Sequence, residues 1–271
     1  MGKISAEGKK YYFEKLKQYK ENIEQIRLRE KNLLQIIQRD ESGAEYKRIT
    51  LADESLNLVS YFILMNNLSL TLLGIKNEAY LNDARKACYK GLIYLEEIVS
   101  NYIDVPFSDY EERLEKIAGY GQRERWNLIK KLGYSIQSVK DGFGENSKWK
   151  WSFVELEGRL ATVAKNFLDL KTLIKGLDPR ADAYEERYEH LALVKQLLQQ
   201  SADRYREKYE LSTLRLDDFK LAINYLGALR RLHALLGEVE ESEVVKKKID
   251  IWKAKMDADQ KNIEKSGKGK R

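Results

Sequence analysis

The stretch that decides the fold is FVELEGRLATVAKNFLDLKTLIKGL, residues 153–177. Its apolar side chains recur at alternating intervals of three and four residues, which places them along one side of an α-helix. A helix with such a stripe buries it against neighbouring helices. The stretch therefore predicts one helix that packs side by side with others, through Phe153, Leu156, Leu160, Val163, Phe167, Leu170, Ile174 and Leu177.

Local signals predict where this helix begins. Ser152 and Glu155 have the spacing of a capping box, in which each side chain accepts a hydrogen bond from a backbone N–H of the first turn. Trp151 before that cap and Leu156 after it are placed to pack as a hydrophobic staple. We therefore expect Trp151 to fix the start of the helix as a packing residue.

Three more helices follow in the same pattern. Gly176 can end the first helix, Asp178 can cap the next, and Pro179 suits its first position. Asp217 is a candidate cap of the third helix, which Gly237 would close. The last helix carries an apolar stripe of Val245, Ile249, Trp252, Met256 and Ile263.

The four helices are joined by short connections, which favours antiparallel neighbours. Residues 152–264 are therefore predicted to form an antiparallel four-helix bundle. The sequence KSGKGKR at 265–271 has four basic residues and no acidic one, and we expect it to be a disordered basic tail.

The first half of the chain also carries helical patterns. A long helix is expected from about Ala6 to Arg39, with Glu30 as a polar interruption of its apolar stripe. Residues 52–73 are apolar on more than one face, which is typical of a central, buried helix. Gly74 can close that helix, and Asn77 can begin the next.

These elements predict an all-α, elongated two-lobed protein. Its parts are an N-terminal helical lobe with the long first helix (1–141), a linker (142–151) and the four-helix bundle (152–264). The linker prediction depends on the glycines and polar residues of GFGEN, residues 142–146.

Composition limits the class of protein. The single cysteine, Cys88, excludes an internal disulfide. No stretch of 18 residues is wholly apolar, so we expect no transmembrane segment. The start, MGKISAEGKK, has no apolar core and does not read as a secretory leader. We expect a cytoplasmic protein if this start is native, and a periplasmic one if a leader has been removed.

Residues suited to catalysis or metal binding are few. Neither His190 nor His233 has a glutamate three residues before it, and neither belongs to an H-E-x-x-H motif. His233 on an apolar face suggests a core or rim residue, and His190 beside two glutamates suggests a surface residue. The glycine pairs at 119–121 and 142–144 lack the further glycine or lysine of a phosphate-binding loop. We therefore expect no enzyme, cofactor or metal site.

Binding is then the expected function, and aromatic residues beside lysines are its best candidates. We predict that Tyr120, Phe143, Lys148, Trp149 and Lys150 form an exposed patch that binds other proteins or a second copy of the chain. Trp151 and Trp252 are predicted to pack in the interior.

Two other partners fit parts of the sequence. Nucleic acid could be bound by the tail 265–271, by the lysines 246–248 and by Trp149 between its two lysines, since lysines contact phosphates and aromatics stack on bases. This is the alternative function. A membrane surface is less favoured, because the stripe of the first helix has the width of a packing seam and suits a partner helix better.

The order of elements resembles the all-helical flagellar-coiling proteins that coat or shape spirochaete periplasmic flagella. Two stretches are similar in their general composition to such proteins: KKYYFEKLKQY at 9–19 and DADQKNIEKSGKGKR at 257–271. The resemblance implies a structural protein with a filament partner, exported with its leader removed. It implies no functional residues.

Overall fold

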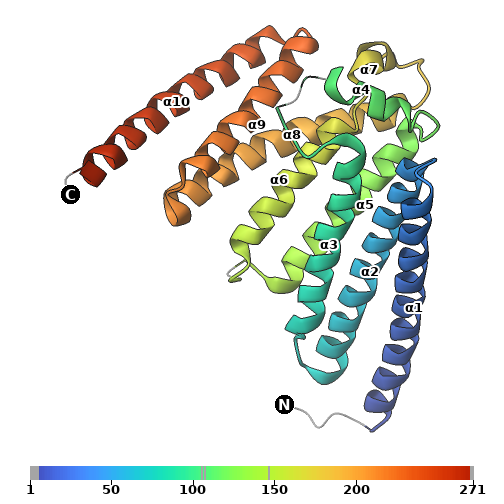
Figure 1. The fold of residues 1–271 in the computed structure, drawn as a ribbon. Coiled ribbons are helices and arrows are strands. Elements are labelled where there is room, and N and C mark those ends of the chain that lie inside the picture. Colours follow the sequence, from blue (N-terminus) through green and yellow to red (C-terminus); the bar gives the residue numbers. More distant parts are fainter. Residues whose placement is uncertain (1–5, 105, 107, 146, 269–271) are drawn as a thin grey trace. The chain divides into compact units, whose positions relative to one another are not determined.

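A computed structural model describes residues 6–104, 106, 108–145 and 147–268 (Figure 1). Within them the chain is 84% helix with ten α-helices and no strand, so the predicted all-α class is confirmed. The helices are α1 (Ala6–Arg39), α2 (Ala44–Leu73), α3 (Glu78–Val99), α4 (Ser108–Glu115), α5 (Gln122–Phe143), α6 (Lys150–Asn166), α7 (Leu170–Gly176), α8 (Tyr184–Lys208), α9 (Leu216–Leu235) and α10 (Val239–Lys268), with a π-helical turn at Tyr209–Thr213.

The chain divides into two compact units. The first unit is Met1–Ser100 with Glu112–Leu156, and the second is Asn101–Glu111 with Glu157–Arg271. The boundary after Leu156 lies inside α6, so residues 142–151 do not form the separate linker that the sequence predicts. They belong to the first unit because Phe143 is buried there and Ser152, just beyond them, bonds to α3.

In the first unit α1, α2 and α3 lie side by side, and α5 packs on α2 and α3 (Figure 1). The core consists of leucines and other aliphatic residues of these helices; Leu56, Leu92 and Leu95 are fully buried. The predicted long first helix is present with its expected bounds. Asn77 caps α3 by accepting hydrogen bonds from the N–H groups of Ala79 and Tyr80, as predicted.

The polar interruption of the α1 stripe is buried and paired. Glu30 is 8% exposed, accepts a hydrogen bond from Tyr94 Oη at 2.6 Å and lies 2.5 Å from Lys90 Nζ. Burial and the bond to Glu30 raise the pKa of Tyr94, since both disfavour the phenolate. A charged residue in the stripe therefore joins α1 to α3.

In the second unit α8, α9 and α10 pack in chain order, and the end of α6 bonds to His190 of α8 and Tyr225 of α9. The prediction of one helix over residues 153–177 is wrong, because α6 ends at Asn166 and α7 begins at Leu170. Asp169 caps α7 by accepting hydrogen bonds from Lys171 N and Thr172 Oγ1. Phe167, in the break, is fully buried, so the apolar stripe continues although the helix does not.

The predicted capping box at the start of α6 is wrong. The helix begins at Lys150, and Ser152 Oγ instead lies 3.0 Å from both Tyr89 Oη and Arg85 Nη1. The Ser152 hydroxyl thus bonds to side chains of α3, whereas the local sequence pattern predicts a bond to the backbone of its own helix.

Two further caps differ from prediction in the second unit. Helix α8 begins at Tyr184 rather than after Asp178, whose carboxylate pairs with Arg180 in the preceding turn. Helix α9 begins at Leu216, so Asp217 lies inside its first turn rather than before it. Of the expected disordered tail 265–271, residues 265–268 continue α10 as helix, and residues 269–271 lie outside the described part of the chain. Helix elongation adds one backbone hydrogen bond per residue, which favours this continuation.

Candidate functional site

One apolar concavity of the first unit is a groove between α2 and α5, with a volume of about 590 Å³. We call it the α2–α5 groove. Helix α2 supplies an apolar wall and α5 a mixed one. The lining residues are Val59, Ser60, Ile63 and Leu64 of α2, with Asn127, Lys130, Lys131, Tyr134, Ser135 and Ser138 of α5.

The groove exists because the part of α2 from residue 52 to residue 73 is apolar on more than one face. One side of α2 is buried against α1 and α3, while Leu64 and Leu70 on other sides remain 45% and 50% exposed. Across the groove Tyr134 of α5 is 73% exposed. Large side chains with this exposure, gathered on adjacent helices, are typical of binding surfaces.

The same property makes α2 the one helix, among the described residues, that is long and apolar enough to cross a membrane. Only 39% of its most apolar 18-residue window is buried inside the structure. A core helix passes this test too. Part of α2 is therefore an apolar surface that the described chain leaves exposed. The function of the protein depends on what binds to this surface.

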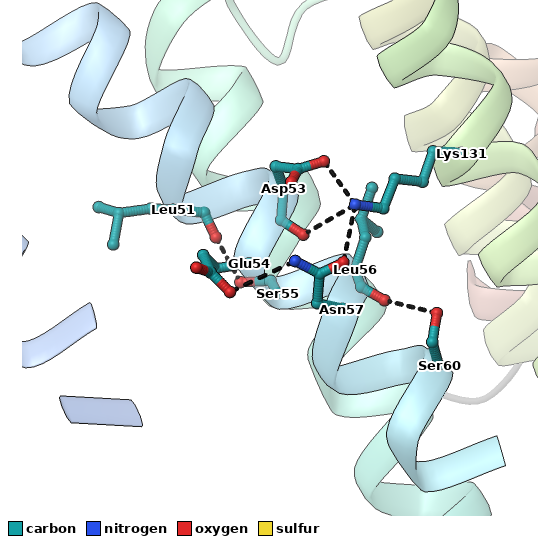
Figure 2. Close-up of polar contacts among 8 residues, drawn as sticks. All are labelled: Leu51, Asp53, Glu54, Ser55, Leu56, Asn57, Ser60 and Lys131. Atoms are coloured by element: carbon teal, nitrogen blue, oxygen red, sulfur yellow. Dashed lines mark hydrogen bonds and ion pairs between the residues drawn. The ribbon is translucent and has the colours of Figure 1, made fainter. Parts of the chain in front are cut away.

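Lys131 fixes the two walls of the groove relative to each other (Figure 2). Its Nζ lies 2.6 Å from Asp53 Oδ1, 2.9 Å from Asn57 Oδ1 and 3.4 Å from the Asp53 carbonyl oxygen. The ammonium thus donates to three acceptors on one turn of α2, and α5 is attached to α2 at this end of the groove.

The network extends to α1. Asn57 donates to Glu54 Oε2 at 3.3 Å, and Arg29 of α1 donates to Glu54 Oε1 at 2.8 Å. Burial alone would raise the pKa of Glu54, but the hydrogen bonds from Arg29 and Asn57 outweigh it, so this pKa lies below its usual value. Three helices are therefore joined through one ionic network beside the groove.

Lys130, the neighbour of Lys131, differs in having no carboxylate partner among the residues that the structure describes. Its Nζ lies 5.2 Å from the centroid of the Trp126 ring. The groove thus has an apolar wall and, at its rim, one cation that no carboxylate neutralises in the described part of the first unit.

The sequence-predicted patch is only partly exposed. Phe143 is 7% exposed, so the premise of an exposed aromatic is wrong for this residue. Trp149 is half-buried; Arg85 stacks over its ring at 3.9 Å, and the Phe143 ring centroid lies 6.3 Å away. Lys148 is exposed and Lys150 is half-buried. Phe143 is buried at the end of α5, and the Trp149 ring lies under Arg85 of α3 just before α6 begins.

Tyr120 does not join the other four residues. It precedes α5, whereas Phe143 ends it, and a 22-residue helix is about 33 Å long. Tyr120 is half-buried, and this burial, with Asp53 nearby, raises its pKa to about 12. The five residues therefore form no single patch, and a role of their exposed members in binding stays a prediction.

The residues considered for chemistry have structural surroundings. His190 is fully buried, with Nε2 2.9 Å from the Ala164 carbonyl oxygen, so its prediction as a surface residue is wrong. His233 Nδ1 lies 2.6 Å from Glu238 Oε2 at the rim of the second unit, in accord with a rim histidine. Burial raises the pKa of the Cys88 thiol to about 12, which makes it a poor nucleophile. No cluster of three or more metal-ligating side chains occurs in the described parts of the chain.

The lysines proposed for nucleic acid are partly engaged. Lys246 pairs with Glu243, and Lys248 pairs with Asp203 while lying 4.8 Å from the Trp252 ring centroid. Lys247 is exposed. Nucleic-acid binding stays a prediction, with fewer free cations here than the sequence suggests.

Sequence reasoning missed the α2–α5 groove. Its signal is present in the sequence, because residues 52–73 are apolar on more than one face, a pattern that equally predicts a central, buried helix. Which face of α2 stays uncovered depends on where α1, α3 and α5 pack. The packing of these helices is a property of the tertiary structure, and no local sequence pattern predicts it.

Comparison with known proteins shows the family to which the chain belongs. No curated protein sequence and no solved structure matches it. The sequence profile of the TP0443 family matches residues 8–260, which covers nearly all of both units. The chain therefore belongs to the TP0443 family.

Proposed function

We propose that this protein is a non-enzymatic assembly protein, which binds an amphipathic helix of a partner protein in the α2–α5 groove. The observation that carries the proposal is the apolar surface of Leu64 and Tyr134, exposed on the two walls of one groove. Helix-in-groove binding is a recurrent mode in which leucine or aromatic anchors at helical spacing fill such a groove.

The energetics favour a covered state. Removing apolar surface from water contributes roughly 25 cal/mol per Å², so covering a leucine or tyrosine side chain contributes about 1–3 kcal/mol. Tyrosine is among the residues that dominate binding energy at protein interfaces, and helix-binding grooves also use apolar side chains such as leucine. Leu64 and Tyr134 are thus the expected anchors.

The charge of the groove rim predicts a second property of the partner helix, an acidic residue. Lys131 is already satisfied by Asp53 and Asn57, whereas Lys130 has no carboxylate partner within the described chain. A partner helix with an aspartate or glutamate beside its apolar stripe would supply one. We therefore commit to an acidic amphipathic helix as the occupant.

The fixed walls suit this function. The Lys131 network joins α1, α2 and α5, so the groove is held open without its ligand. A preformed groove loses less conformational entropy on binding than one that must form.

The experiment is site-specific photocross-linking of the full chain in its source cells. A photoreactive amino acid replaces Leu64, and a control replaces Ile93 of α3, which is equally exposed at 45% but does not line the groove. We expect the Leu64 probe, and not the Ile93 probe, to capture one protein through a helical segment with apolar residues three and four apart and an acidic neighbour.

Other adducts contradict the proposal. Capture of a second copy of the chain would make the groove a self-association surface, and capture of phospholipid would make α2 a membrane-contacting helix. Equal capture at both positions would mean that the groove has no specific occupant.

The resemblance to flagellar-coiling proteins gives the proposal a narrower form, in which the partner helix belongs to a filament subunit. Co-sedimentation of the chain with isolated flagellar filaments, compared with a Leu64→Asp variant, tests this form. Binding of neither variant would exclude the filament as the partner, and equal binding of both would exclude the groove as the surface that binds it.

A further inference from the structure

The second unit contains a groove of a different character between α9 and α10. Its volume is about 450 Å³, within the roughly 300–1,000 Å³ of pockets that hold small molecules. We call it the α9–α10 groove. Its lining residues are Asp104, Ile223, Asn224, Gly227, Arg230, Arg231, Ala234, Ile249 and Lys253.

The floor and the rim of the α9–α10 groove have opposite polarity. Ile223, Gly227 and Ala234 recur at helical spacing on one face of α9, and Ile249 faces them from α10. No side chain at Gly227 fills the space, since the nearest atom to a β-carbon built there is Arg231 Nη1 at 3.8 Å. An apolar group of a ligand therefore has room on this floor.

The rim carries an excess of positive charge. Arg230, Arg231 and Lys253 line the groove with a single carboxylate, Asp104, which pairs with Arg231. Arg230 and Lys253 form no ion pair within the residues described, and Arg230 is half-buried. Three cations and one carboxylate leave a net charge of +2 on the lining.

The buried surroundings of the groove are positive too. Lys165 is 6% exposed, and its Nζ donates to the Ile103 carbonyl oxygen at 3.3 Å. The pKa of Lys165 is lowered to about 8, mainly because burial disfavours the ammonium and also because the charge of Arg231 is near. Asp104 opposes this effect only in part.

We propose that the α9–α10 groove binds an organic phosphate monoester, with the phosphate between Arg230, Arg231 and Lys253 and the organic group on Ile223 and Ile249. A phosphate monoester carries a charge of about −1.5 to −2 at pH 7, which matches the lining. Arginine is suited to phosphate because its guanidinium donates two parallel hydrogen bonds. Soluble esters and the headgroup of phosphatidic acid share this chemistry.

The test is calorimetric titration of the full chain with phenyl phosphate, and with phosphatidic acid vesicles in a parallel arm. We expect saturable binding of one of the two, weakened about tenfold by Arg230→Gln and by Lys253→Gln, since each removes a charge-assisted hydrogen bond. Lys247→Gln is the matched control, because it removes the same charge from α10 outside the groove. It should change the affinity less than about twofold.

The two arms identify the source of the phosphate. Binding of phenyl phosphate assigns a soluble ester, and binding of vesicles alone assigns the lipid headgroup. The proposal is overturned if neither probe binds, if phenol binds as well as phenyl phosphate, or if Lys247→Gln weakens binding as much as Arg230→Gln. Circular dichroism of each variant separates lost binding from lost folding.

Discussion

Gly158 of α6 faces two buried tyrosines, and replacing it by alanine should destabilise the second unit. A β-carbon built at Gly158 lies 2.6 Å from Tyr205 Cε2 and 2.7 Å from Tyr225 Oη. The two rings are stacked with centroids 5.6 Å apart and are at most 4% exposed, so neither can move aside freely. Overpacking of this kind costs about 1–3 kcal/mol.

Helix propensity acts in the opposite direction and sets the net effect. Alanine in a helix interior is favoured over glycine by about 1 kcal/mol. The expected result for Gly158→Ala is therefore a net loss of about 0–2 kcal/mol in the free energy of unfolding. Gly227→Ala on α9 is the control, because its β-carbon meets nothing closer than 3.8 Å. It should gain about 0.5–1 kcal/mol.

The assay is urea unfolding followed by circular dichroism, with hydrogen exchange of the α8 amides to report on the second unit alone. The two variants should differ by about 0.5–3 kcal/mol, with Gly158→Ala the less stable. If Gly158→Ala is as stable as Gly227→Ala, then α6 does not approach the tyrosines closely and the described packing of the second unit is wrong.

Three further predictions concern polar and aromatic contacts. Hydrogen bonds from Lys195 and His233 outweigh the effect of burial and hold the pKa of Glu238 below its usual value. Its stabilisation is therefore full above the unfolded pKa near 4.5 and lost as pH falls through the folded one, so Glu238→Gln should flatten the acid side of a plot of Tm against pH. Tyr94→Phe should cost about 1–3 kcal/mol in urea unfolding, because it removes the hydrogen bond to a buried carboxylate. Trp149→Ala should lower Tm measurably, by a loss of about 1–3 kcal/mol, since the ring packs under a guanidinium; an unchanged Tm would restore its interpretation as an exposed recognition residue.

Much of the fold could be predicted from the sequence because helices are specified locally. The three-and-four spacing of apolar residues, and local stops such as Gly74 and Asn77, depend on neighbours along the chain. The break between α6 and α7 at Asp169 could not be predicted from the apolar spacing. The apolar spacing continues across it, because Phe167 still points into the core while the backbone leaves the helix.

Long-range partners account for most of the errors. Ser152 reads as a cap, but its hydroxyl bonds to residues more than sixty positions away. Glu30 is an interruption of the apolar stripe in the sequence, and in the structure it is paired with a distant residue, Tyr94. The α2–α5 groove is of the same kind, since no local pattern says which side of an apolar helix its neighbours leave open.

The affinity of the captured helix for the α2–α5 groove tests the central claim most directly. The segment cross-linked at Leu64 is synthesised as a peptide and titrated against wild type, Leu64→Asp, Lys130→Gln and the surface control Ile93→Asp. We predict saturable one-to-one binding to wild type and to Ile93→Asp, at least about tenfold weaker binding to Lys130→Gln, and none to Leu64→Asp. Equal affinity for Leu64→Asp and Ile93→Asp would contradict the assignment of this groove as the binding surface.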